Sequence, residues 1–173
     1  MNRFVNLALG LSLALFALPL HSQNKLNVEL KDAKGNSVGS AVIADQAKGV
    51  VLDLHLHGLP PGEHAIHFHQ SAHCDLPDFQ TAGGHNNPDS KKHGFDNPQG
   101  HHAGDMTNFK VGDDGKAEVK LEDKDVTVSP GPHSLLNFGG SSVIIHAKPD
   151  DYKTDPSGNS GDRIACGVIV FMH

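Results

Sequence analysis

The stretch KLNVELK at residues 25–31, followed by DAKGN at residues 32–36, establishes the pattern that decides the fold. Apolar and polar residues alternate through the first segment, so every second side chain is suited to burial. Alternation with a period of two predicts a β-strand with one buried face, and the Asp/Gly/Asn-rich segment after it predicts a turn.

The same alternation recurs along the chain and gives no convincing amphipathic helix. Turn signals such as LPPG at residues 59–62 and GDDG at 112–115 separate the runs at short intervals, as in antiparallel folds. We therefore expect an all-β sandwich or barrel of about eight strands, interrupted by two long polar loops at residues 70–107 and 148–162. The further strands are expected at residues 37–44, 49–59, 63–69, 108–111, 117–121, 142–147 and 163–171.

Composition favours one globular domain and excludes some partners. Of the 173 residues, 37 % are hydrophobic and 20 % are charged, which suits a single folded unit. The net charge is −6 and no run of Lys or Arg offers a surface for phosphates, so we do not expect a nucleic-acid partner. Fourteen His equal Lys and Arg combined, which raises the hypothesis of metal binding at once.

The N-terminal segment predicts export. An apolar run at residues 4–20 follows Arg3 and ends at Ser22, which is typical of a secretory signal peptide at residues 1–22. A short membrane anchor is the alternative, disfavoured by Pro19 and by the lack of a flanking cationic cluster. We expect a mature domain at residues 23–173, located in a periplasm or outside the cell, with no membrane partner after cleavage.

Two cysteines remain in the expected mature chain, Cys74 and Cys166, 92 positions apart. Because exported proteins fold in an oxidising compartment, we expect these two residues to form a disulfide. A pair of buried thiols is the alternative.

Several histidines lie in positions from which their side chains could bind one metal ion. In the strand at 63–69 the alternation puts His67 and His69 on one face, opposite Ile66 and Phe68. The loop at 70–107 adds more His and Asp residues, and imidazole and carboxylate are ligands that zinc and copper accept. These further candidates are His85, His93, His102 and Asp105, with His146 from a distant strand. A His-rich but solvated loop is the alternative interpretation.

Six segments of the chain resemble the copper/zinc superoxide dismutases. His93 follows His85 by eight positions, His102 follows His93 by nine, and Asp105 follows His102 by three. These three spacings match the zinc loop of that family. The resemblance covers essentially the whole expected mature chain. The segments are GEHAIHFH at 62–69, AGGHNNP at 82–88, KHG at 92–94, HAGD at 102–105, IHAKPDD at 145–151 and GNSGDRIACG at 158–167.

The resemblance implies a Greek-key antiparallel β-barrel that dismutates superoxide to oxygen and hydrogen peroxide by one-electron cycling of copper. It implies three terminal copper ligands, a shared imidazolate between copper and zinc, and three further zinc ligands. It also implies a carboxylate that accepts hydrogen bonds from His67 and His93, and an arginine that binds the superoxide anion. His67, His69 and His146 match the terminal copper ligands, His85 matches the shared imidazolate, and the further zinc ligands are His93, His102 and Asp105. Asp150 matches the carboxylate and Arg163 the arginine. The resemblance makes His85 and Arg163 the catalytic pair. The family motif selects His102 over the adjacent His101.

Other histidines resemble ligands only superficially. The pair His55 and His57 has the same His-x-His form, but the family places that strand away from copper, and we expect both side chains to be exposed. His73 and His101 are expected to be exposed loop residues, and His173 is terminal.

Departures from the family leave two questions open. Cys74 follows His69 as in bacterial secreted members, whereas the segment at 90–94 is similar to eukaryotic ones, so monomer and homodimer both remain open. Asp162, directly before Arg163, either weakens the local positive field or supports Arg163 through a salt bridge.

Two other functions compete with a dismutase. A metal-carrying or chaperone-like relative would keep the fold without catalysis, and loss of a copper ligand or of Arg163 would favour it; all are present. A zinc hydrolase would need an open zinc position and a placed general base, which two interlocked ligand sets disfavour.

Overall fold

The computed structural model describes residues 25–171, so the expected signal peptide and His173 lie outside the described residues. No helix among the described residues is long and apolar enough to cross a membrane. Two single 3-10 turns, η1 (Gln80–Ala82) and η2 (Asn137–Gly139), accompany the strands. The strands are β1 (Lys25–Asp32), β2 (Ser37–Asp45), β3 (Val50–Leu56), β4 (Gly62–His64), β5 (Ile66–His69), β6 (Phe109–Val111), β7 (Ala117–Asp123), β8 (Ser141–His146) and β9 (Arg163–Ile169).

The all-β prediction is confirmed, with one difference in the strand count. The run expected as a single strand at 63–69 is two strands, because the chain changes partners at Ala65, whose backbone bonds only to the end of β8 and to the loop just after it. Its N–H donates to Lys148 O at 2.9 Å, and its carbonyl accepts the His146 N–H at 2.9 Å. β4 therefore pairs with β6, while β5 pairs with β8.

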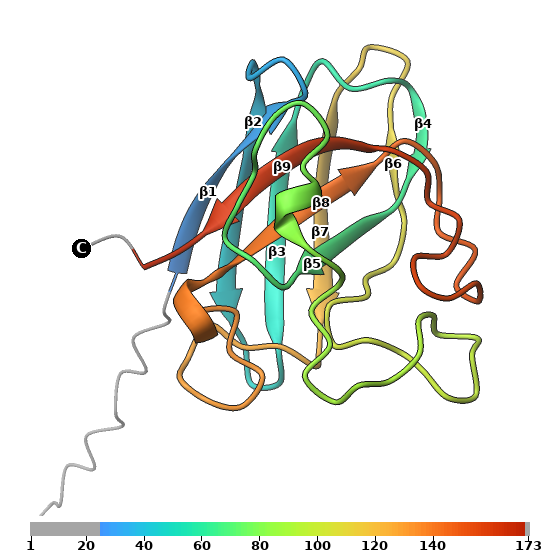
Figure 1. Ribbon diagram of the computed structural model, residues 1–173. Coiled ribbons are helices and arrows are strands. Elements are labelled where there is room, and N and C mark those ends of the chain that lie inside the picture. The colour runs from blue at the N-terminus through green and yellow to red at the C-terminus, as the bar shows by residue number, and fades with distance from the viewer. Residues whose placement is uncertain (1–24, 172–173) are drawn as a thin grey trace, which may run out of the picture.

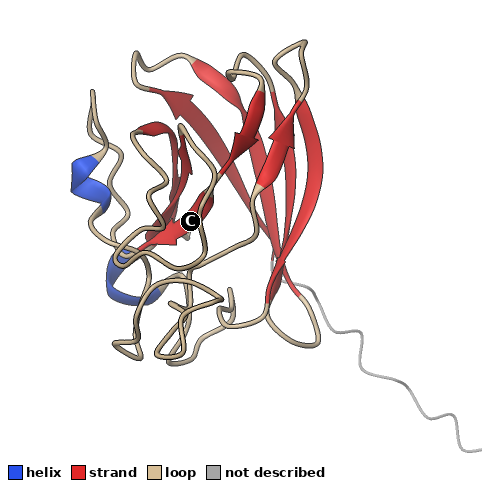
Figure 2. Cartoon of the chain, turned by 90° about the vertical axis from the view of Figure 1, so that its right-hand side faces the viewer, coloured by secondary structure: helices blue, strands red, loops and turns tan. Residues whose placement is uncertain are grey.

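Seven strands form one antiparallel sheet in the order β5-β8-β9-β1-β2-β3-β7, and β4 with β6 forms a second, small sheet. The large sheet curls strongly (Figures 1 and 2). The weakest junction in it is between β1 and β9, which pair only through Lys31 with Cys166 and Asp32 with Ala165. The sheet can fold over at this junction because few ladder hydrogen bonds oppose the bend.

One apolar core fills the inside of the curl. Val28 and Leu30 of β1 are buried and alternate with exposed polar residues, as the sequence pattern requires. Leu54 of β3 and Phe68 of β5 belong to the same core although their strands are far apart in the sheet order. The closed, barrel-like sandwich follows from that shared core.

The loop between β5 and β6 is bound through its backbone to the free edge of β5, the edge that does not pair with β8. Phe68 donates its N–H to Gly104 O at 2.9 Å, and its carbonyl accepts the Asn86 N–H at 2.8 Å. A Cβ at position 104 would lie 2.5 Å from Phe68 O, so only glycine permits this approach. The loop consequently covers the face of β5 that carries His67 and His69.

A disulfide joins Cys74, in the same loop, to Cys166 in β9, which confirms the expected pairing. Beneath it Phe79, Ala82 and Ile144 form a small second apolar cluster. The loop is thus fixed to the barrel at two places, by the backbone of β5 and by the disulfide.

We predict that Cys166→Ser lowers the melting temperature of the oxidised protein, because the bond closes a loop of 92 positions. In the chain-entropy model such a loop stabilises the folded state by up to about 4.6 kcal/mol. Differential scanning calorimetry of the parent, Cys166→Ser and the matched control Cys74→Ser measures the effect. Both variants should lose the same stability; melting temperatures equal to that of the oxidised parent would show that the disulfide contributes nothing.

Candidate metal centre

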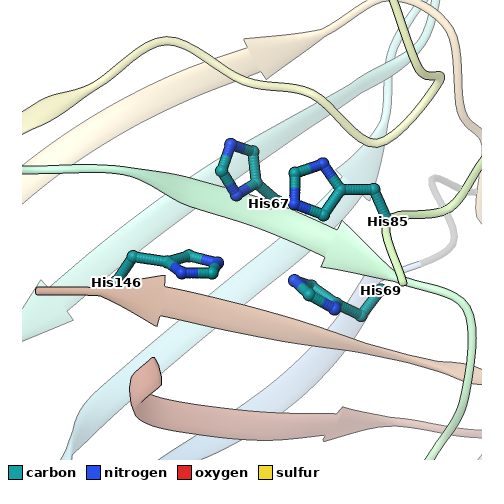
Figure 3. Close-up of side chains that lie close together, drawn as sticks. All are labelled: His67, His69, His85 and His146. Atoms are coloured by element: carbon teal, nitrogen blue, oxygen red, sulfur yellow. The ribbon is translucent and has the colours of Figure 1, made fainter. Parts of the chain in front are cut away.

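Four buried imidazole rings converge on one space beside β5. His67 and His69 come from β5 and His146 from the end of β8, while His85 is brought in by the loop (Figure 3). His85 pairs with His69 through an isolated backbone bridge, which sets its place opposite the strand. Their side chains offer nitrogens within 4.8 Å of one another, and all four residues are 6 % exposed or less.

Hydrogen bonds to acceptors fix the tautomers of three of these rings. His67 Nε2 lies 2.7 Å from Asp150 Oδ2, and His69 Nδ1 lies 3.0 Å from Gly83 O. His146 Nδ1 lies 3.3 Å from a backbone carbonyl oxygen. Because a carboxylate or a carbonyl only accepts, the proton of each neutral ring lies on the nitrogen that faces it. The other nitrogen of each ring therefore carries a free lone pair.

Those free nitrogens are buried and have no hydrogen-bond partner among the described residues. A buried polar atom without a partner costs on the order of 1–3 kcal/mol, so such atoms are rare unless a ligand satisfies them. Here four occur together, and all belong to the four converging rings. The atoms are His67 Nδ1, His69 Nε2, His85 Nε2 and His146 Nε2.

A second cluster shares His85 with the first. Asp105 Oδ1 lies 2.8 Å from His85 Nδ1, 3.1 Å from His93 Nδ1 and 3.4 Å from His102 Nδ1. His102 Nδ1 and His85 Nδ1 are 3.4 Å apart. Ligands of a tetrahedral zinc ion, each about 2.0–2.1 Å from it, lie about 3.3 Å from one another, which is close to these four distances. His67 also approaches His85, His93 and Asp105, but its remaining nitrogen, Nδ1, is one of the partnerless atoms of the first cluster, so we take His102 as the fourth member of the second set.

Asp150 connects the two clusters. Its Oδ2 accepts from His67 Nε2 at 2.7 Å and its Oδ1 accepts from His93 Nε2 at 3.0 Å. The carboxylate is buried and orients one ring of each cluster at the same time. Both contacts had been implied by the family resemblance.

Electrostatics divide the rings by the balance between burial, which lowers a pKa, and hydrogen bonds to carboxylates, which raise it. Burial, together with the charge of neighbouring rings, lowers the pKa of His85 to about 3 and that of His146 to about 2. Burial also acts on His93, but its hydrogen bonds to Asp105 and Asp150 outweigh it and raise the pKa of His93 to about 9. Near neutral pH the first two rings therefore present lone pairs, whereas His93 must release a proton before it can bind a metal ion.

A cavity of about 960 Å³ opens beside the first cluster and is lined by His69, His85, His146 and Arg163. Arg163 donates to Phe79 O at 2.6 Å and to Gly83 O at 2.7 Å, so the disulfide-bonded loop holds its guanidinium. The remaining donors of a guanidinium are left for an anion. The pKa of Arg163 is lowered, because the effect of burial exceeds the opposing effect of the negative charge of Asp78.

Asp162 does not support Arg163 through a salt bridge: no ion pair joins them among residues 25–171. Asp162 and Asp78 both line the cavity, with Lys34 as a further cation. Asp78 was not anticipated, because only the fold brings the loop at 70–107 to Arg163.

The surplus histidines behave mostly as expected. His55, His57 and His73 are exposed. His101 differs from the expectation: it is half-buried, and its Nε2 lies 3.0 Å from Asp125 Oδ2. The expectation failed because Asp125 reaches this loop from a segment beyond β7.

Two residues around Asp150 were missed altogether, Asn108 and Tyr152. Tyr152 is the only tyrosine of the chain and lies in an otherwise polar loop, which is the signal that could have singled it out.

Comparisons with known proteins agree with this geometry. A model of the family described as copper/zinc superoxide dismutase matches residues 37–169. A Cu-Zn superoxide dismutase of Aquifex aeolicus is 43 % identical over 162 residues, which cover 92 % of this chain and 96 % of the relative. A Cu-Zn superoxide dismutase of Caulobacter vibrioides is 40 % identical over 165 residues, covering 94 % and 95 % of the two chains.

Solved structures give the same result. The crystal structure of a superoxide dismutase-like protein from Bacillus subtilis superposes with a TM-score of 0.80 at 41 % identity, covering 83 % of this chain and 97 % of that one. The Cu/Zn superoxide dismutase of Brucella abortus gives a TM-score of 0.67 at 26 % identity, covering 84 % and 99 %. The barrel, the two histidine clusters and these similarities identify the chain as a member of the copper/zinc superoxide dismutase family.

Proposed function

We propose that the protein is an exported superoxide dismutase that uses copper at the first cluster and zinc at the second, linked through the imidazolate of His85. The observation that carries this proposal is the set of four partnerless imidazole nitrogens in one buried space, one of them on a ring shared with a second His/Asp set.

The donor sets fit these two metals. Three terminal imidazoles, His67, His69 and His146, suit copper, while two imidazoles, the shared ring and Asp105 suit zinc. Bound copper would supply one-electron oxidation and reduction, and bound zinc a fixed positive charge without redox chemistry. In the overall reaction one superoxide gives up an electron and becomes oxygen, while a second takes up that electron and two protons and becomes hydrogen peroxide.

The residues of the chain would bind the anion and manage the protons. Arg163 would attract superoxide into the cavity and fix it with planar donors, since its other N–H groups are held by Phe79 and Gly83. His85 lines the same cavity and its Nε2 is one of the four partnerless nitrogens, so this atom would hold a proton in one half of the cycle and deliver it to the reduced product in the other. Asp150 would keep His67 and His93 oriented throughout.

Export is the second part of the proposal. The apolar segment before Ser22 and the disulfide between Cys74 and Cys166 both support it, because stable disulfides are typical of oxidising compartments. Terminal sequencing of the protein recovered from the extracytoplasmic fraction should begin at Gln23. An intact residue 1 in protein retained inside the cell would contradict export.

A non-catalytic metal-binding relative is the alternative, since one similar protein is named only as superoxide dismutase-like. The presence of all four converging histidines and of Arg163 argues for the enzyme.

We predict that His85→Ala uncouples the two metals. Copper should remain on His67, His69 and His146, but its electronic spectrum should shift and superoxide decay should slow at least tenfold, as for loss of a proton donor. Metal analysis and stopped-flow superoxide decay, before and after copper removal, measure this, with His55→Ala as an exposed-histidine control. An unchanged copper spectrum and an unchanged rate would sink the bridging role, and a parent inactive when fully loaded would favour the non-catalytic alternative.

We further predict that charges at the cavity set the encounter rate. Arg163→Ile should lower the second-order rate with copper content unchanged, whereas Asp78→Asn and Asp162→Ser should each raise it at low salt. The gain should shrink as the Debye length falls from ~30 Å at 0.01 M to ~8 Å at 0.15 M. Stopped-flow measurement of superoxide decay at both salt concentrations tests this. If Asp78→Asn or Asp162→Ser were slower than the parent at both concentrations, repulsion by that carboxylate would be refuted.

A further inference from the structure

Asp150 carries the connection between the two clusters, yet no strand fixes it. β8 ends at His146 and β9 begins only at Arg163, so Asp150 lies in a connecting loop. Its two carboxylate oxygens must nevertheless stay within hydrogen-bond distance of both His67 and His93. A loop residue holds such a position only if other contacts immobilise it.

The backbone of Asp150 is held by one side chain. Asn108, directly before β6, accepts the Asp150 N–H with its Oδ1 at 2.9 Å and donates its Nδ2 to Asp150 O at 3.0 Å. This pair of bonds fixes the peptide but leaves the carboxylate free to rotate about its side-chain torsions.

Tyr152 supplies the missing constraint. Its backbone N–H donates to Asp150 Oδ1 at 2.7 Å, the same oxygen that accepts from His93. Its phenolic oxygen accepts the backbone N–H of Asn108 at 2.7 Å. Asn108, Asp150 and Tyr152 therefore form a closed ring of hydrogen bonds, in which each residue is bonded to the other two.

The chain accepts backbone strain to place Tyr152 there. Its φ is 59°, in the left-handed region that a bulky residue rarely adopts. Its carbonyl accepts the Asp96 N–H at 2.9 Å, and its ring packs 5.7 Å from that of Phe95. A Cβ at Gly94, whose φ is 99°, would lie 2.2 Å from Tyr152 O, so glycine is required for this approach. Contacts with residues 94–96 and with Asn108 thus stabilise one strained residue.

We propose that Tyr152 is a positioning residue of the metal centre, whose phenolic oxygen locks the loop so that the Asp150 carboxylate holds His67 and His93 at once. The inference rests on the proposed metal-binding function and adds to it a residue that touches neither cluster. Tyr152 acts through Asp150, and it controls how firmly the second cluster retains zinc.

The variant Tyr152→Phe isolates the phenolic oxygen, since the ring and the backbone N–H remain. Thr154→Val is the matched control, because it removes a hydroxyl from the same loop that bonds to Asp151 and not to Asp150. The purified full chain is loaded with zinc, and the release of zinc to excess chelator is followed at neutral pH. A second readout is the hydrogen exchange of the ring Nε2–H protons of His67 and His93, observed by NMR.

Tyr152→Phe should speed zinc release roughly 3- to 10-fold, less than the 10- to 100-fold typical of losing a residue that bonds directly to a metal ligand. Exchange of both ring protons should quicken as well, while Thr154→Val should match the parent in both measurements. In the Asp150→Ala background, adding Tyr152→Phe should change zinc release no further, because non-additivity reveals action through a shared partner.

Two results would overturn the inference while zinc uptake by the parent remained normal. One is Tyr152→Phe behaving like Thr154→Val in both readouts. The other is an undiminished effect of Tyr152→Phe in the Asp150→Ala background, which would make the tyrosine a general brace of the loop. A parent that took up no zinc would instead refute the proposed metal centre, and this inference with it.

Discussion

Burial of polar imidazoles side by side is the constraint on which this structure depends. His67, His69 and His93 are almost completely removed from water, and an unsatisfied ring nitrogen in that environment is costly. The fold answers by giving each ring at least one acceptor, which is a carboxylate of Asp105 or Asp150 or a backbone carbonyl such as Gly83 O. The nitrogens that remain without partners are then gathered at one place, where a metal ion can satisfy them together.

That arrangement requires loops whose positions are fixed by contacts with the barrel. The segment after β5 is bound back onto β5 by backbone hydrogen bonds at Phe68 and fixed to β9 by the disulfide from Cys74. The segment after β8 is held through Asp150, whose carboxylate meets both clusters. The barrel supplies three of the four converging rings, and the two bound loops supply His85 and the orienting carboxylate. Stability of the loops and geometry of the centre are therefore the same physical problem.

At the cavity, too, one group has two structural roles. Gly83 O accepts from His69 Nδ1 and from the Arg163 guanidinium, so one carbonyl orients a ring of the first cluster and the cation beside it. A shift of the disulfide-bonded loop would move both. Asp78, on that loop, and Asp162, on the other, reduce the positive charge that Arg163 provides at the cavity. The charge of the cavity lining is thus set by residues of several loops, Lys34 among them.

The sequence alone indicated most of the strands and the disulfide partners, and with the family resemblance it named the candidate metal ligands. Alternation in segments such as 25–31 requires one buried face, and the spacing of His85, His93, His102 and Asp105 is a local pattern that survives without coordinates. Tertiary structure decided what depends on contacts between distant positions. Asp150 meets His67 across 83 positions, and Asn108 meets Tyr152 across 44. The break at Ala65, the burial of His101 and the roles of Tyr152 and Asp78 arise in the same way, because pairing partners and charged neighbours are chosen by packing, which no local pattern in the chain encodes.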